Sequence, residues 1–293
     1  MNKIKWVNSF AFALVILMCF VIVNSVTFVP EAFGAGSQIE TEADIDDDTD
    51  ISVDNSTIEN GDNSSMSSAL YKAGDSAKAW QVGYAKFLSA VGFKSTITGT
   101  LGYRAVGVIS VDQSLTTYRT RYGNGDFYSY SRSTGTRDTK SETFIDANSG
   151  YIYYYQNNAK TAYTLSSYQA NFGIKPGDFN YVINESTIIS EKSFKHKTNG
   201  DYEFVFNLTT NGSATAAYSK FINLNGREIL GSAMPIFTSI EITLTVNSKG
   251  EFKKIYAEDH YYFDILGRIT GVSKVTETFS GFKYYEPKEP TWL

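Results

Sequence analysis

Runs of alternating apolar and polar residues, separated by very short turns, constrain the fold of this chain most. Between residues 95 and 156 each run ends at a turn rich in Gly, Asn and Ser. Such turns are too short to hold a helix, so neighbouring runs are expected to pair side by side as antiparallel strands. The predicted strands are 95–103, 106–122 with a break near Asp112, 127–133, 141–146 and 151–156.

A second set of strands begins near residue 202. Ile240, Ile242, Leu244 and Val246 alternate with polar residues, which indicates a strand with one buried face. The segment 163–183, which joins the two sets, is expected to be irregular because Pro176-Gly177 enforces a turn. The predicted strands of the second set are 202–208, 240–246, 252–263 and 268–279.

Two helices are predicted, and each has one apolar side. The first begins at Asp75 or Ser76 and ends by Gly92. The second is short and begins at Ser213, between the first two strands of the second set. A helix of this kind must cover another apolar surface. The apolar stripes are Trp80, Tyr84, Phe87, Leu88 and Val91 in the first helix and Ala214, Ala217, Tyr218, Phe221 and Ile222 in the second.

The N-terminal region differs from the rest of the chain. Residues 1–35 combine Lys3 and Lys5 with an apolar run at 10–23 and small residues at 32–35, which predicts a signal peptide cut near Gly34 or Ala35. An uncleaved membrane anchor is the alternative. Cys19, the only cysteine, would be lost on cleavage. Residues 36–70 hold ten acidic and no basic side chains, which predicts a disordered linker before a single domain at 71–293.

The chemistry of a catalytic or metal site is not evident in this sequence. The chain has two histidines, of which His196 is expected in a solvated turn and His260 on a strand, where it shares a face with Glu258. Zinc, phosphate-loop and serine-hydrolase motifs are absent from the sequence. From Met66 onward the chain has 24 basic and 20 acidic residues, a net charge of +4 that is too weak to indicate nucleic acid. We therefore expect no enzymatic activity, no metal and no cofactor.

The aromatic content is the most informative feature for function. The chain has 21 Tyr and 20 Phe, and the run 151–156 places aromatic rings on both faces of a strand. Three interpretations are open: a core packed with rings, a platform of exposed rings for carbohydrate, or a sheet curved around an apolar space.

The order of elements resembles the LolA superfamily of bacterial lipoprotein carriers, which includes the LppX-like proteins. The resemblance depends on the first helix, DSAKAWQVGYAKFLSA, on the strand DYEFVFNL with its following helix AAYSKFI, and on the strands from FTSIEITLTV to TETF. It implies an α+β fold in which a strongly curved antiparallel sheet forms an unclosed half-barrel. The N-terminal helix and the second short helix would cover its concave face, above an apolar cavity.

From these observations we expect an exported, non-enzymatic protein, secreted or associated with the cell envelope, that holds a lipid or another hydrophobic molecule. A cell-surface interaction or carbohydrate-binding module without a cavity is the alternative. The expected partners are the apolar ligand and a cell-envelope protein, with peripheral membrane contact left open. The residues expected to line the cavity, each of which is equally explained as plain core, are Trp80, Tyr84, Phe87, Tyr153, Phe204, Phe206, Ile242 and Leu244.

Overall fold

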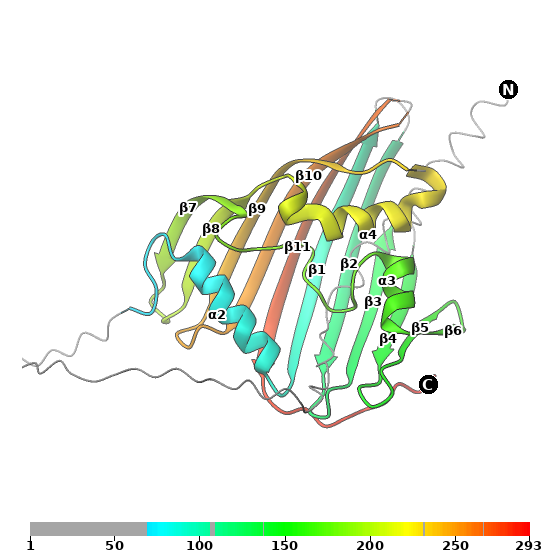
Figure 1. The fold of residues 1–293 in the computed structure, drawn as a ribbon, viewed down its shortest axis with the longest axis horizontal. Helices are drawn as coiled ribbons and strands as arrows, with labels where there is room; N and C mark the ends of the chain where they lie inside the picture. Colours follow the sequence, from blue (N-terminus) through cyan, green and yellow to red (C-terminus); the bar gives the residue numbers. More distant parts are fainter. Residues whose placement is uncertain (1–68, 106–108, 137, 231, 266) are drawn as a thin grey trace, which may run out of the picture. The chain divides into compact units, whose positions relative to one another are not determined.

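The computed structural model describes residues 69–293 apart from 106–108, 137, 231 and 266. The described residues form one antiparallel sheet of eleven strands in the order β6-β5-β4-β3-β2-β1-β11-β10-β9-β8-β7 (Figure 1). The sheet is not closed, because β6 and β7 lie at its two edges. The predicted signal peptide, its cleavage site and the acidic linker at 36–68 lie outside the described residues.

Successive strands are neighbours in the sheet, first from its centre to one edge and then from the opposite edge back to the centre. The chain starts in β1, moves outward to β6, crosses to β7 at the opposite edge and returns to β11, which pairs with β1. The bounds are β1 Phe93–Ala105, β2 Ile109–Arg121, β3 Phe127–Gly135, β4 Thr139–Ile145, β5 Ile152–Gln156, β6 Ala159–Tyr163, β7 Ile188–His196, β8 Tyr202–Leu208, β9 Ile236–Val246, β10 Phe252–Asp264 and β11 Arg268–Phe282.

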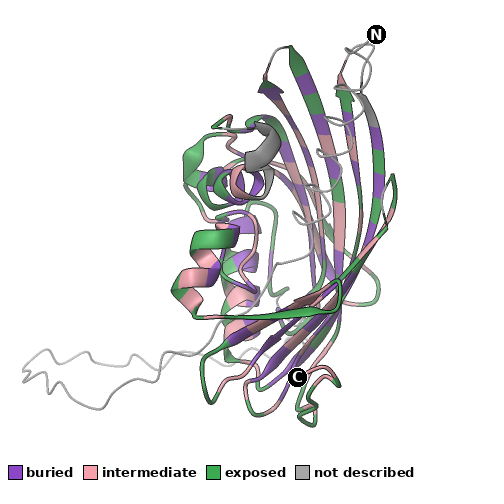
Figure 2. Cartoon of the chain, turned by 90° about the vertical axis from the view of Figure 1, so that its right-hand side faces the viewer, coloured by how far each residue is buried: buried purple, intermediate pink, exposed green. Residues whose placement is uncertain are grey.

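Three helices lie against one face of this sheet. They are α2 (Ser76–Ser89), α3 (Leu165–Phe172) and α4 (Gly212–Leu230). Figure 2 shows them together on the hollow side of the curved strands. Side chains on this covered face alternate with outward-facing ones along β8, where Tyr202, Phe204, Phe206 and Leu208 are buried. The predicted fold class, a curved and unclosed antiparallel sheet with helices over its concave face, is confirmed.

The strand β2 continues through the position where a break was predicted. Asp112 pairs with Gly102 of β1 inside a regular register. Its side chain is exposed, and its carboxylate accepts a hydrogen bond from Arg104 at 2.6 Å. The polar residue is therefore tolerated on the solvent side of the strand, where it does not interrupt the ladder.

The segment between the two strand sets is more regular than predicted. It contains α3, which follows directly after β6. Thr164 caps the start of α3, where its hydroxyl accepts from Ser167 N, and Gly173 caps the end in the left-handed conformation. His196, expected in a solvated turn, is the last residue of β7 and stacks on Tyr202. The second helix is also longer than predicted, since α4 runs on to Leu230.

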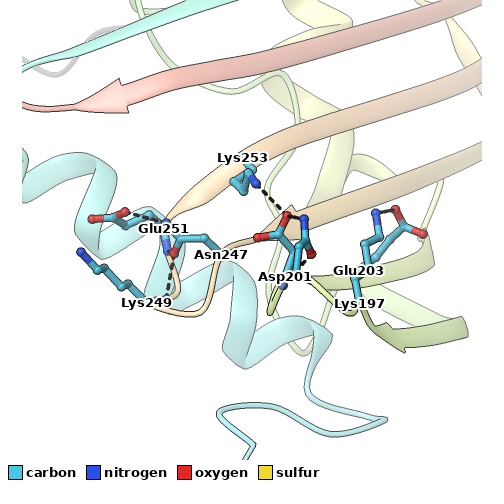
Figure 3. Close-up of polar contacts among 8 residues, drawn as sticks. Lys197, Asp201, Glu203, Asn247, Lys249, Glu251 and Lys253 are labelled. Carbon is cyan, nitrogen blue, oxygen red and sulfur yellow. Dashed lines mark hydrogen bonds and ion pairs between the residues drawn. The ribbon is translucent and has the colours of Figure 1, made fainter.

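Hairpin turns at one end of the sheet are connected by polar side chains (Figure 3). In the turn before β8, the Asp201 carboxylate accepts from Asn199 at 2.9 Å and from Lys253 of β10 at 2.7 Å. In the turn before β10, the Asn247 amide donates to Glu251 at 2.7 Å. The ion pair with Lys253 ties the β7–β8 hairpin to the β9–β10 hairpin.

Helix α2 is held at both ends by charged side chains from strands. At its start, Glu191 of β7 accepts hydrogen bonds from Gly74 N at 2.8 Å and Ser76 N at 3.2 Å, while Asp75 makes no side-chain cap. At its end, Arg121 of β2 donates to the carbonyls of Phe87 and Ala90, both at 2.6 Å. Each charge is opposite to the helix dipole at its terminus, so both contacts stabilise the docked helix.

Gly83 lets the middle of α2 approach the sheet closely. A Cβ atom at this position would lie 2.3 Å from the ring of Phe252 in β10. The ring therefore packs directly against the helix backbone. The C-terminal part of the predicted stripe differs from expectation, because Val91 follows the end of the helix and is exposed.

Replacing Arg121 with Met is expected to lower the free energy of unfolding by about 1–3 kcal/mol. The buried carbonyl of Phe87 and the partly buried carbonyl of Ala90 would lose their donor, and an unsatisfied buried acceptor costs about this much. Urea denaturation measures the change. The control Arg132→Met removes an exposed guanidinium from β3 and is expected to change stability by less than about 0.5 kcal/mol. Equal effects of the two substitutions would contradict the role of Arg121.

Candidate functional site

A small pocket lies between α2, the concave face of the sheet and the segment 173–187 that joins α3 to β7, which we call the crossing segment. Its volume is about 70 Å³. Trp80 of α2 and Phe179 and Ile183 of the crossing segment form one side. Side chains of the four central strands form the other side: Ile97 of β1, Val275 of β11, Ile255 and Ala257 of β10, and Ile242 of β9.

Aromatic rings pack closely around this pocket. The Trp80 ring lies 5.0 Å from the Phe179 ring and 5.1 Å from the Phe252 ring, measured between centroids. Phe87 extends the cluster to Phe93 and Phe279 on the sheet, at 4.8 and 6.1 Å. Tilted and edge-to-face arrangements at these distances are favourable for aromatic pairs. Most of the space under α2 is therefore filled by rings, and the pocket is the part left free.

Polar groups also line this pocket, from Asn180 and Tyr181 of the crossing segment, Asp259 of β10, and Ser273 and Glu277 of β11. Asp259 and Ser273 are partners across the two strands and lie side by side. Asp259 is 2% exposed, and its Oδ2 accepts a hydrogen bond from the Tyr181 hydroxyl of the crossing segment at 2.7 Å. Neither Asp259 Oδ1 nor Ser273 Oγ has a partner at hydrogen-bond geometry among the described residues. The Ser273 hydroxyl is nevertheless close enough to Asp259 and to Tyr218 to lower the pKa of both, against the larger effect of burial.

The pKa of Asp259 is strongly raised. Burial in the apolar interior raises it to about 7, although the hydrogen bond from Tyr181 acts in the opposite direction. Burial likewise raises the pKa of the Tyr181 hydroxyl well above its usual value, so this group stays a neutral donor. At neutral pH the Asp259 carboxyl is consequently poised between its protonated and charged forms.

Glu277 differs from Asp259 because it has a cation beside it. Its carboxylate forms a buried ion pair with Arg119 of β2, whose Nε donates to Ser95 at 3.1 Å. Burial raises the pKa of Glu277, and Arg119 opposes this shift. Burial lowers the pKa of Arg119 to about 10, so the guanidinium remains charged at neutral pH. The charge of Glu277 is thus balanced, whereas no described Lys, Arg or His forms an ion pair with Asp259.

Of the eight residues predicted to line a cavity, Trp80 and Ile242 line the pocket. Tyr84 and Phe87 lie beside it, with ring centroids 5.9 and 5.5 Å from that of Phe179. The other covered residues, Phe204, Phe206 and Leu244, are fully buried in the core.

Tyr153 is placed on the opposite face from the other seven. In β5, Ile152 and Tyr154 are buried on the helix-covered side, and Tyr154 contacts Phe172 of α3 at 5.5 Å. Because adjacent strand residues point to opposite faces, Tyr153 lies on the outer face, where Lys160 is positioned over its ring. The two aromatic faces of this strand are thereby explained: one packs under α3 and the other is on the convex surface.

Sequence analysis did not single out Asp259, Glu277, Phe179 or Tyr181. A signal for the first two exists in the alternation itself. Asp259 has the same parity as Ile255, Ala257 and Tyr261, and these positions are on the covered face of β10. An acidic residue at an apolar position of a strand therefore indicates a buried carboxyl. Phe179 and Tyr181 give no such signal, because their segment has no periodic pattern.

The surroundings of Glu258 and His260 agree with a surface role. His260 Nε2 lies 3.2 Å from Glu258 Oε1, and Lys274 Nζ lies 3.1 Å from the same oxygen, on the face opposite to Asp259.

Within the described ranges, no cluster of three or more His, Cys, Asp or Glu side chains could hold a metal ion. None of the helices in this part of the chain combines the length and apolarity needed to cross a membrane.

Replacing Asp259 with Asn is expected to change how stability depends on pH. Because the folded pKa is raised, the folded protein keeps a proton that the unfolded chain loses, and the free energy of unfolding falls between about pH 4 and about pH 7. Loss of this proton lowers the free energy of unfolding by about 1.4 kcal/mol per pH unit within this range. Urea denaturation of both proteins across this range measures it. The wild type should lose more stability than Asp259→Asn, and parallel profiles would contradict a buried, proton-retaining carboxyl.

No protein-family model and no curated protein matches the sequence. Similar solved structures include a LolA superfamily protein from Nitrosomonas europaea (10% identity, 74% of this chain and 98% of that chain, TM-score 0.25). Another is a putative outer membrane lipoprotein-sorting protein domain from Vibrio parahaemolyticus (10% identity, 73% of this chain and 93% of that chain, TM-score 0.25). A third is the ywiB protein from Bacillus subtilis (7% identity, 65% of this chain and 94% of that chain, TM-score 0.22). The first of the three carries the name of the superfamily that the sequence resembles. These values say nothing about a ligand.

Proposed function

We propose that this protein is an exported, non-enzymatic binding protein that holds a lipid or another hydrophobic molecule between the concave face of the sheet and α2. The observation that carries the proposal is the pocket itself. It lies under a helix, its lining is mostly apolar, and the side chains around it are large rings that can repack around a guest. Export through residues 1–35 and the acidic linker are part of the proposal and lie outside the described residues.

The size of the pocket limits how a ligand can bind. A cavity of about 150 Å³ is known to hold benzene, and this pocket is about 70 Å³. The structure therefore corresponds to a closed state that admits the end of a ligand. A longer chain would lie where Trp80 and Phe179 now pack, which requires α2 or the crossing segment to move outward. Burial of the chain would supply about 25 cal/mol per Å² of apolar surface before the cost of this movement.

The cover is held in part by contacts that can rearrange. The Tyr181 hydroxyl of the crossing segment donates a hydrogen bond to Asp259 on the pocket floor. The middle of α2 is held by ring packing, and its polar contacts are at its two ends, with Glu191 and Arg121. Ring packing lacks strict directionality, so rings can exchange partners for an acyl chain without leaving polar groups unsatisfied.

Replacing Ala257 with Leu is expected to abolish binding of an apolar probe while the fold persists. Ala257 lines the pocket, and the larger side chain would occupy it. Titration of the purified protein with a fluorescent fatty-acid analogue measures the affinity. We expect saturable binding by the wild type and at least about a tenfold loss in Ala257→Leu.

The matched control for this experiment is Thr278→Leu. Thr278 is exposed on the outer face of β11, so the substitution adds similar apolar volume without reaching the pocket. Thr278→Leu should bind the probe like the wild type. If the wild type does not bind the probe, or if Ala257→Leu and Thr278→Leu bind it equally well, the proposed function is wrong.

A second candidate function is carbohydrate binding by the convex face. Tyr118 is 54% exposed and stacks on Tyr130, with centroids 6.5 Å apart. Beside them, a depression of about 460 Å³ combines Tyr130 and Tyr155 with polar side chains such as Gln156. Ring faces next to hydrogen-bonding groups suit sugar rings. Binding of soluble peptidoglycan fragments that is lost in Tyr118→Ala and retained in Ala257→Leu would support this function, and no binding would exclude it for that glycan.

A further inference from the structure

Two buried polar atoms of the pocket lining have no partner at hydrogen-bond geometry. Asp259 Oδ1 and Ser273 Oγ both belong to pocket-lining residues, and both lack a hydrogen-bond partner among the described residues. Asp259 is 2% exposed and Ser273 is 1% exposed. Buried polar groups in folded proteins are almost always satisfied, so this pair indicates that a group from outside the chain completes the site.

The charge around these atoms favours one kind of group. The pocket lining has two carboxyl groups, Asp259 and Glu277, and no Lys, Arg or His. Glu277 has Arg119 as its cation. Only neutral hydroxyls, those of Tyr181 and Ser273, lower the pKa of Asp259, and its charge is near enough to the phenols of Tyr218 and Tyr261 to raise their pKa values. An isolated buried carboxylate is unfavourable unless a cation pairs with it.

We propose that the pocket binds the cationic amine end of an amphiphilic ligand, with Asp259 Oδ1 as the acceptor and Ser273 Oγ beside it. This inference rests on the proposed function, because it specifies the polar end of the ligand held in the same space. An ammonium group has three donors and no acceptor, which matches an unpaired carboxylate oxygen next to a hydroxyl. The hydrogen bond to Asp259 would be charge-assisted.

The dimensions of the pocket agree with this assignment. A cavity needs about 10–15 Å³ of this kind of volume to hold one water molecule, so about 70 Å³ is room enough for an ammonium and the methylene attached to it. The adjoining apolar side chains, Trp80, Ile242 and Val275, would then contact the following methylenes. A buried water could satisfy the same hydrogen bonds, but it would leave the carboxylate charge without a counter-ion.

The experiment compares three probes with the same decyl chain, which are n-decylamine, n-decanol and decanoate, each below its aggregation limit. The full chain is titrated at about pH 8, where Asp259 is mostly charged and the amine is protonated. Isothermal titration calorimetry measures each affinity. We expect the amine to bind at least about tenfold more tightly than the alcohol, and decanoate to bind most weakly, because a buried charge-assisted hydrogen bond has this strength.

The variants separate the buried carboxyl from surface charge. Asp259→Asn should weaken decylamine binding by about tenfold or more and change decanol binding by less than about threefold. Glu258→Gln is the matched control, because the adjacent carboxylate carries the same charge but lies on the outer face with Lys274. It should leave decylamine binding unchanged.

Each outcome bears on a different claim. If the wild type binds the amine and the alcohol with equal affinity, the amine inference is overturned and the proposed function is left intact. This result needs no variant. Equal losses in Asp259→Asn and Glu258→Gln would also overturn it, since they would indicate attraction to the acidic surface. Binding of none of the three probes by the wild type would overturn the proposed function, and the amine inference with it.

Discussion

The fold depends on apolar packing across one face of a single open sheet. A sheet of this kind has an apolar face that must be covered, and here no second sheet is present among the described residues to cover it. Three helices and the crossing segment perform that role. The most aromatic part of this packing lies between α2 and the sheet, where Trp80 and Phe87 contact Phe252 and Phe279. Because rings are rigid and bulky, they fill most of the space under α2 and leave one small pocket.

The polar groups on the concave face follow from this packing. Every side chain that points to the helix-covered face of the sheet is removed from water, whatever its chemistry. Each polar side chain on that face therefore needs a partner from the protein or from a ligand. Glu277 forms an ion pair with Arg119, and the C-terminal carbonyls of α2 accept hydrogen bonds from Arg121. Asp259 is satisfied at one oxygen by Tyr181. The same hydrogen bond attaches the crossing segment to the sheet.

Local sequence patterns predicted most of the sheet and the amphipathic helices, because alternation and turn chemistry are local properties. The strands near 127–133 and 240–246 agree with β3 and β9, and the first helix agrees with α2. The prediction was wrong where tertiary contacts decide. Asp112 stays inside a strand, where its exposed side chain pairs with Arg104, and α4 continues to Leu230 beyond its predicted stripe. The position of Tyr153 could not be predicted, since both faces of its strand are aromatic.

The central claim is that the space under α2 takes an apolar ligand, and native mass spectrometry tests it most directly. The full chain is expressed in bacterial cells, purified without detergent and sprayed from volatile buffer with and without added decyl amphiphile. The account predicts a mass above that of the polypeptide, which disappears on denaturation and identifies the bound molecule. A mass equal to the polypeptide alone, both before and after addition of the amphiphile, would contradict it.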